Sequence, residues 1–278
     1  MTTSRRIPWL PIVLGLILVA LTAALLYRGW SFYQLSLEDR VEHPDFRQLR
    51  PSGLVGNGYG WIAALLVVLN LSYLVRRRLG GSRFGSMRIW LDIHVFTGLF
   101  AATLATFHSA FQLRTPITQI SAASLGIVVL TGLIGRFLYA LAPGNDRERL
   151  REALDDMERV WPGHREELAN AIEALPSVAV PANASLLRSV LSVPAWRSVG
   201  RRRREALALI IPRERDREQK RAARRLANVA ATEAGSSGKT ALLRSWRGLH
   251  RFFALLMLAS VLMHAGIAWY FGYRWVFE

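Results

Sequence analysis

Five stretches of this chain are apolar over about twenty residues or more, the length that a helix needs to cross the hydrocarbon core of a bilayer. They are residues 7–27, 54–75, 89–113, 117–142 and 249–273. A backbone exposed to lipid must satisfy its hydrogen bonds within its own segment, so each stretch is expected to be a helix. The sequence therefore predicts an all-α integral membrane protein with five transmembrane helices.

The first apolar stretch follows Arg5 and Arg6, as the apolar part of a secretion signal would. Its length of about twenty residues and the lack of a clean small-x-small cleavage site favour a retained anchor helix instead. We expect residues 1–53 to form this anchor and an external loop. Residues 54–142 then hold helices two to four, and residues 249–278 hold helix five.

The orientation follows from the distribution of arginine, because cytoplasmic loops of membrane proteins carry the excess of positive charge. The turn between the second and third helices has five arginines and no acidic residue, whereas the loop 28–53 has four arginines and four acidic residues. The arginines of the turn are Arg76, Arg77, Arg78, Arg83 and Arg88. We therefore expect the N-terminus to be cytoplasmic and the C-terminus external. The membrane is expected to be the inner (cytoplasmic) membrane of a bacterium.

Two histidine pairs lie inside the predicted helices, His94 with His108 and His250 with His264, each pair fourteen residues apart. Fourteen helical residues turn through about 1400° and rise about 21 Å, so both members of a pair share one face. The third and fifth helices run in the same direction, so His94 matches His250 near the cytoplasmic face and His108 matches His264 near the external face. Two levels of paired imidazoles are the geometry that holds two haems.

Histidines inside a membrane also have other roles. A single intramembrane histidine more often makes a hydrogen bond than binds a metal. A zinc or copper site needs its ligands within a few ångströms, and no carboxylate or thiol lies at ligand spacing beside either level. Between the histidines, Gly98 leaves space for a flat macrocycle, although close helix packing in lipid also favours small residues. Four histidines at two matched depths favour bis-histidine haem ligation.

The chain thus resembles the di-haem membrane b-type cytochromes, including the ferric-reductase-like transmembrane group. The resemblance rests on WLDIHVFTGLFAATLATFHSAF (90–111) and LHRFFALLMLASVLMHAGIAWYFGYRW (249–275), and covers about 54–142 and 245–278. It implies a four-helix haem-binding bundle holding two haem b groups, the inner one between His94 and His250 and the outer one between His108 and His264. It also implies a quinone pocket near one haem.

The sequence departs from the reductases of that group, which commonly carry a flavin and nicotinamide module after the last helix. The chain ends at Glu278 and has no G-x-G-x-x-G after a strand. We therefore expect the electrons to come from a quinol or from a separate redox partner subunit, such as an iron–sulfur protein, a flavoprotein or a multihaem cytochrome. The absence of cysteine excludes disulfides, thiolate-bound clusters and covalent c-type haem.

Arginines near the inner histidines are candidate counter-ions for haem propionates. They are Arg88, Arg247 and Arg251. The positive-inside rule alone would also place arginines at these helix ends. Asp92, two residues before His94, is expected to be a polar residue at the membrane interface rather than a proton relay.

Residues 143–248 form a basic insert between the fourth and fifth helices, with 21 basic and 14 acidic residues. Two amphipathic helices are predicted at 146–160 and 163–175, followed by a proline-containing stretch. The strongly basic run 197–232 is expected to act as a helical arm on anionic lipid or a redox partner, with partial disorder where charge is densest. Nucleic acid is not expected as a partner, because no binding motif and no interleaved aromatics accompany the arginines.

The sequence GSSGKT (235–240) looks like the end of a phosphate-binding loop. The full pattern needs a glycine where this chain has Glu233, and no strand precedes it. We therefore expect a helix C-cap and a flexible linker.

Together these observations predict a di-haem cytochrome b subunit that transfers electrons across the membrane. With histidine on both sides of each iron, no site is open for oxygen chemistry. The alternative is a non-redox membrane scaffold or sensor that recruits partners through its basic insert. A transporter for metal or haem, with the histidines as transient ligands, is a third hypothesis.

Overall fold

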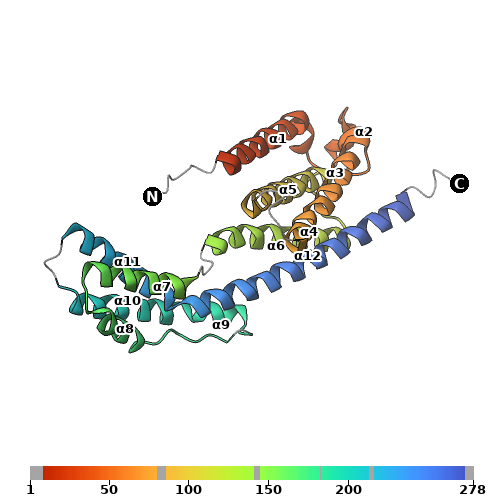
Figure 1. Cartoon of the computed structure of the whole chain (residues 1–278). Coiled ribbons are helices and arrows are strands. Elements are labelled where there is room, and N and C mark those ends of the chain that lie inside the picture. The colour runs from red at the N-terminus through yellow and green to blue at the C-terminus, as the bar shows by residue number, and fades with distance from the viewer. Residues whose placement is uncertain (1–8, 80–85, 141–144, 182, 213–215, 273–278) are drawn as a thin grey trace. The chain divides into compact units, whose positions relative to one another are not determined.

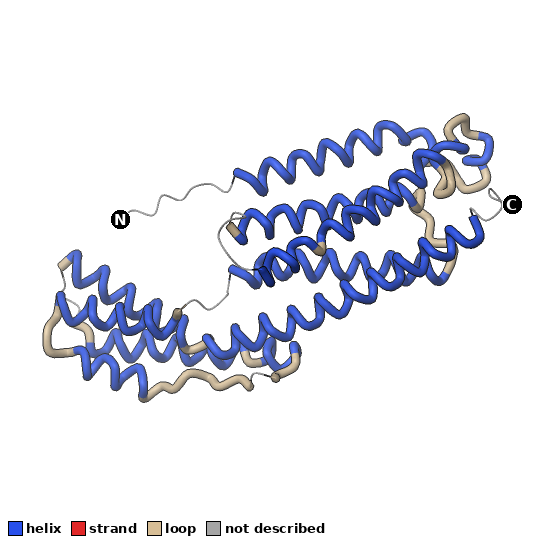
Figure 2. The backbone as a smooth tube through the Cα atoms, turned by 45° about the vertical axis from the view of Figure 1, so that its right-hand side comes forward, coloured by secondary structure: helices blue, strands red, loops and turns tan. Residues whose placement is uncertain are grey.

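The structure is a computed structural model that describes residues 9–79, 86–140, 145–181, 183–212 and 216–272, and within these ranges all regular structure is helical (Figures 1 and 2). It confirms the all-α fold. Five helical segments are long and apolar enough to cross a membrane, so this is a multi-pass membrane protein by length and composition. The five segments are Trp9–Tyr33, Phe46–Arg78, Met87–His108, Pro116–Leu138 and Ser236–Phe271.

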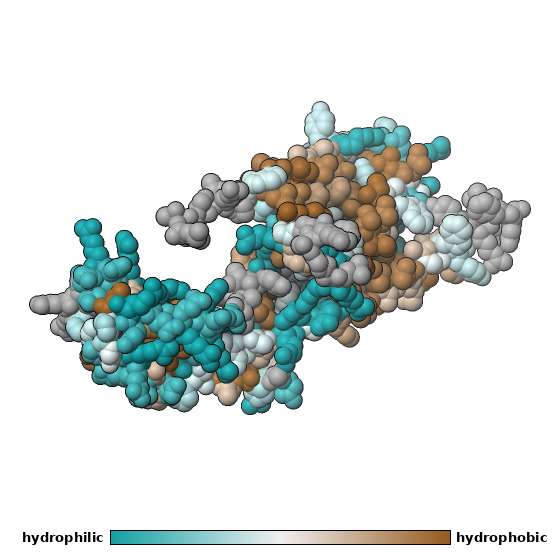
Figure 3. All heavy atoms as spheres, in the orientation of Figure 1, coloured by the Kyte–Doolittle hydropathy of each residue, from teal (hydrophilic) through white to brown (hydrophobic). Residues whose placement is uncertain are grey.

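The chain divides into two compact units. Unit 1 comprises residues 1–133 and 252–278, and unit 2 comprises residues 134–251, which include the predicted insert. Figure 3 shows that apolar side chains cover much of the visible surface of unit 1, while hydrophilic side chains cover most of unit 2. Each unit therefore exposes the surface that its expected solvent requires, lipid for the first and water for the second.

Unit 1 is built around α5, on which α3 packs most extensively and α1 packs at its side. Its helices are α1 (Trp9–Tyr33), α2 (Phe46–Leu49), α3 (Leu54–Asn70), α4 (Ser72–Leu79), α5 (Met87–His108), most of α6 (Pro116–Ala140) and the C-terminal part of α12 (Ser236–Gly272), with a short 3-10 helix η1 at Asp39–Glu42. The Ser86 side chain caps α5 by accepting a hydrogen bond from the backbone N–H of Ile89.

The predicted second helix, 54–75, is interrupted at Leu71, where α3 ends and α4 begins. At the break the backbone N–H of Leu71 donates to Val68 O at 3.0 Å and that of Leu74 donates to Leu71 O at 2.9 Å, both with three-residue spacing. This tightening leaves the carbonyl of Asn70 at a helix end, where it is available to a partner outside the helix.

The predicted third helix, 89–113, ends early, at His108. Ala110 and Phe111 adopt positive φ angles of 47° and 62°, which terminate the helix as a left-handed C-cap does. The buried Arg40 holds this end in place by donating to Ala110 O at 2.8 Å and to Tyr33 O at 2.7 Å. His108 is therefore the last residue of α5, at a point fixed by the loop between α1 and α3.

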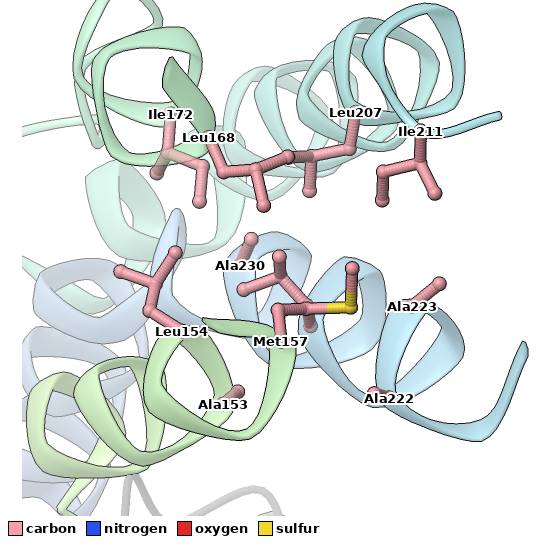
Figure 4. Packing of buried hydrophobic residues seen from close by; sticks show 11 residues of the cluster. Ala153, Leu154, Met157, Leu168, Ile172, Leu207, Ile211, Ala222, Ala223 and Ala230 are labelled. Atoms are coloured by element: carbon pink, nitrogen blue, oxygen red, sulfur yellow. The ribbon is translucent and has the colours of Figure 1, made fainter. Parts of the chain in front are cut away.

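Unit 2 has its own apolar core. Its helices are α7 (Asp146–Val160), α8 (Arg165–Glu173), α9 (Leu186–Leu191), α10 (Val193–Ile210), α11 (Arg217–Glu233), the end of α6 and the first part of α12. Leu168 and Ile172 of α8 and Leu207 of α10 face Leu154 and Met157 of α7 (Figure 4). The amphipathic pattern predicted α7 and α8 to within two residues.

The basic run 197–232 was expected to be a helical arm, with partial disorder where charge is densest. Its described residues form α10 and α11, which pack against α7 and α8 through small and apolar side chains, and residues 213–215 lie outside the described residues. The expected linker at 235–240 is reduced to Ala234 and Gly235, because α12 already begins at Ser236. Gly235 fits there because a Cβ would overlap the ring of Trp196.

A buried ion pair joins α10 to α11. The Arg203 side chain donates to the Glu233 carboxylate at 2.6 Å, to Leu175 O at 2.8 Å and to Ser177 Oγ at 3.1 Å. Burial raises the pKa of Glu233, but hydrogen bonds from Arg203 and Ser177 outweigh burial, so the pKa lies below its ordinary value. A lowered pKa means that the pair stabilises the fold above the ordinary glutamate pKa and loses this contribution as the pH falls through the folded-state value.

Replacing Glu233 by alanine should leave Arg203 buried without its counter-ion and destabilise unit 2 by about 3–5 kcal/mol. The measurement is amide hydrogen exchange in α10 and α11 of the full chain in detergent micelles. The matched control is Glu152→Ala, which breaks an exposed pair with Arg225 and should cost about 0–1 kcal/mol.

Acidification below about pH 4 should destabilise the unaltered chain more than Glu233→Ala. Equal loss of stability in Glu233→Ala and Glu152→Ala would contradict the stabilising role of the buried Arg203–Glu233 pair.

Candidate functional site

The two histidines of α5 face α3, and each turns the same ring nitrogen toward a backbone carbonyl of that helix. Nδ1 of His94 lies 3.4 Å from Asn70 O, and Nδ1 of His108 lies 2.9 Å from Gly56 O. Asn70 and Gly56 are fourteen residues apart, the same spacing as the two histidines but in the opposite chain direction. One antiparallel register of α3 on α5 therefore positions both imidazoles in the same way.

These contacts favour the same tautomer for both rings. A backbone carbonyl can only accept a hydrogen bond, so Nδ1 must carry the proton and donate it. Nε2 of each ring then presents a lone pair. Histidines that bind metals almost always donate the other ring N–H to a carbonyl, a carboxylate or water. The arrangement on α3 and α5 is therefore the one that prepares an imidazole for metal ligation.

Glycines of α3 create the space for the His108 ring. A Cβ added to Gly60 would lie 2.8 Å from both Cε1 and Nδ1 of His108, which is closer than real side chains approach. Gly56, one turn earlier, supplies the carbonyl that accepts the hydrogen bond. Gly58, between them, has nothing within 4 Å of its Cβ position.

Asn70 fixes the inner end of the same interface. Its side-chain Oδ1 accepts a hydrogen bond of 2.8 Å from the Thr97 hydroxyl, while its backbone carbonyl faces His94. A Cβ on the neighbouring Gly98 would lie 3.3 Å from Asn70 Nδ2. In the described structure Gly98 thus allows α3 and α5 to approach closely, which was the alternative explanation for the small residue there.

The structure brings the predicted outer pair together. The ring centroids of His108 and His264 are 6.2 Å apart, with an angle of 71° between the ring planes. A ring nitrogen lies about 1.2 Å from the imidazole centroid, and a metal–imidazole bond is about 2.0 Å long. Two imidazoles on opposite sides of one metal ion therefore have centroids about 6.4 Å apart. Edge-to-face aromatic pairs also occur at this distance, so the free Nε2 of His108 is the distinguishing feature.

The inner histidines belong to different units. His94, in unit 1, has the Tyr73 ring 4.8 Å from its own, centroid to centroid. His250, in unit 2, stacks on Trp246 with 5.5 Å between the centroids. Trp246 fits beside α6 because residue 135 is glycine, where a Cβ would overlap the indole. The pairing of His94 with His250 stays a prediction.

The candidate propionate arginines differ in their surroundings. Arg88 is exposed in the first turn of α5. Arg247 is half-buried and donates to Leu243 O at 3.0 Å, and the exposed Arg251 donates to Arg247 O at 3.2 Å. Their role as counter-ions stays a prediction. Asp92, expected at the membrane interface, is buried in the protein with 7% of its surface exposed.

Sequence reasoning missed the part played by α3, namely Gly56, Gly60 and Asn70. The signal was present, because Gly56 and Asn70 repeat the fourteen-residue spacing of the histidines. Among the described residues, no group of three or more His, Cys, Asp or Glu side chains is placed to hold a metal ion. A haem iron with bis-histidine ligation takes only two protein ligands. No protein-family model, curated protein or solved structure matches the chain.

Changing Gly60 to alanine should displace the His108 ring and destabilise unit 1 by about 1–3 kcal/mol, because the added methyl group overpacks the contact. Gly58→Ala is the matched control on the same helix and should be neutral or stabilising by about 0.5–1 kcal/mol. Urea unfolding in mild detergent, followed by tryptophan fluorescence, measures both. The interpretation fails if the two alanine variants have the same stability.

Proposed function

We propose that this chain is a membrane electron-transfer subunit that binds two haem b groups, the inner one between His94 and His250 and the outer one between His108 and His264. The observation that supports this most is the contact of Nδ1 of both His94 and His108 with backbone carbonyls of α3. Two carbonyls of α3 hold Nδ1–H of each ring and leave Nε2 available. A histidine placed only for helix packing does not need the same nitrogen oriented at both levels.

The residues present fit the group. The His108 and His264 rings have the spacing of two ligands on one metal ion. Gly60 allows the His108 ring to lie against α3, so the helix backbone rather than a mobile side chain orients it. Bound haem would supply one-electron redox chemistry, while this chain supplies the ligands, the apolar surroundings and the control of the tautomer.

The proposed location is the inner membrane of a bacterium, with the N-terminus cytoplasmic and the C-terminus external. In this orientation His94 and His250 lie toward the cytoplasm, close to Arg88, Arg247 and Arg251, and unit 2 is cytoplasmic. Electrons would then pass between a redox partner subunit on one side and a quinone or an external carrier on the other. Two histidine ligands for each iron would leave no open site for oxygen, which would suit electron transfer rather than catalysis.

The reduced-minus-oxidised absorbance spectrum of the purified chain tests this function. We expect b-type bands equivalent to two haems per chain, and about half of that absorbance in His264→Ala, because each level contributes one haem. His164→Ala, in unit 2 and outside all membrane segments, should keep the full absorbance. A folded chain without haem absorbance would contradict the proposal and favour a scaffold or sensor.

Double variants test the pairing. The double variant His94→Ala/His250→Ala removes both ligands of one level. About half of the haem should remain, the same amount as in His94→Ala or His250→Ala alone. His94→Ala with His264→Ala removes one ligand from each level, so almost no haem should remain. Equal haem content in the two double variants would show that the histidines are paired differently. Bound metal without haem would instead favour a metal transporter.

A further inference from the structure

Arg40 is a buried cation in the loop between α1 and α3, with only 7% of its surface exposed. Its guanidinium donates to Tyr33 O at 2.7 Å, to Ala110 O at 2.8 Å and to Leu35 O at 3.1 Å. It also lies over the Phe32 ring, 5.2 Å from the ring centroid. All of these partners are neutral, so dipoles surround the charge but no anion cancels it.

No carboxylate of the described residues forms an ion pair with Arg40. Two acidic residues of the same loop have other partners, because Asp39 accepts a hydrogen bond from Ser36 at 2.6 Å and Asp45 pairs with Arg28 at 3.1 Å. Burial lowers the pKa of Arg40, yet arginine stays protonated in proteins. The loop therefore holds a full positive charge in a buried position.

This charge lies where two helices end. Tyr33 is the last residue of α1, and Ala110 follows α5, whose last residue is His108. The C-terminal end of a helix carries a partial negative charge of about half a unit. Neutral donors also satisfy carbonyls at a helix end, but only a cation offsets their negative charge. Arg40 therefore changes the electrostatic potential beside His108 as well as holding the end of α5.

We propose that Arg40 raises the reduction potential of the outer haem between His108 and His264, an inference that rests on the proposed function. Reduction of Fe(III) to Fe(II) adds one electron to the site, and a nearby positive charge stabilises the reduced form relative to the oxidised form. Arg40 acts through its charge and needs no contact with the haem. Electrons are thereby stabilised at the outer level, which favours their transfer to the external side.

The size of this effect follows from the distance. Arg40 Nη1 lies 2.8 Å from Ala110 O, and Ala110 is two residues after His108. A spacing of about 3.8 Å between consecutive Cα atoms and the length of a histidine side chain put the guanidinium within about 20 Å of a metal on Nε2 of His108. At an effective dielectric constant of about 20, a charge at about 12–20 Å changes the ratio of reduced to oxidised haem by about four- to tenfold.

The test is a potentiometric titration of the full chain in phosphatidylcholine nanodiscs, followed by the b-type absorbance bands. Arg40→Gln removes the charge, whereas Arg40→Lys keeps the charge but lacks the planar fork of five donors. Arg47→Gln is the matched control, because Arg47 is an exposed cation of α2, which packs beside η1. The double variant His94→Ala/His250→Ala lacks the inner ligands, so the transition that it retains belongs to the outer haem.

We expect Arg40→Gln to lower the potential of the outer transition by about 35–60 mV, the equivalent of a four- to tenfold change. The inner transition should stay in place, because the inner level lies about 21 Å farther along α5. Arg40→Lys and Arg47→Gln should change the outer ratio by less than about twofold, since the first keeps the charge and the second removes a screened one.

An unchanged outer transition in Arg40→Gln, with two haems bound, would overturn this inference and leave the proposed function standing. Equal shifts in Arg40→Gln and Arg40→Lys would also overturn it, because the lost hydrogen bonds would then be the cause. An unaltered chain that binds no haem would contradict the proposed function itself.

A second pair of variants keeps Arg40 and decides the matter if Arg40→Gln does not fold. Phe111 is half exposed, follows Ala110 and has a φ of 62°, a conformation that Asp and Asn tolerate. Phe111→Asp and Phe111→Asn lose the same ring and differ only in charge. The outer potential should be lower in Phe111→Asp than in Phe111→Asn, and equal potentials would overturn the inference.

Discussion

The hydrogen bonds from two imidazoles of α5 to two backbone carbonyls of α3 are the constraint on which unit 1 depends. Polar groups inside a membrane are costly unless they are paired, so each ring nitrogen and each carbonyl in this interface needs a partner. The helix break at Leu71 provides one carbonyl, and the glycine at position 56 provides the other. Both contacts require the same antiparallel register, so a shift of α3 along α5 would break them together.

The described parts of both units are helical, but the two units are expected to face different solvents. Unit 1 leaves many leucine, isoleucine and valine side chains exposed, as the solvent of its helices is expected to be lipid. Unit 2 surrounds a small apolar core with charge and keeps the Arg203–Glu233 ion pair almost out of contact with water. α12 belongs to both units, with arginines along its first part and no charge in residues 252–272.

The spacing of the histidine rings and their orientation depend on different parts of the chain. The side chains of His108 and His264 come from helices far apart in sequence and reach the spacing of a ligand pair. Their orientation, however, is set locally, by the glycines and carbonyls of the adjacent α3. In metal sites generally, groups that are hydrogen-bonded to a histidine ligand likewise determine which of its ring nitrogens is available.

The sequence alone determined the all-α membrane architecture. In lipid, a single run of about twenty apolar residues satisfies its own backbone hydrogen bonds only as a helix. It also determined the shared face of His94 and His108 and the helices α7 and α8, since these follow from helical periodicity. It did not determine where α5 ends or where α3 breaks, because these depend on Arg40 and on carbonyls that distant residues bind. Only the tertiary structure decided that α3 orients the imidazoles, that Asp92 is buried and that the basic run folds onto its own core. These features depend on contacts between residues distant in sequence, which local patterns of hydropathy and charge do not specify.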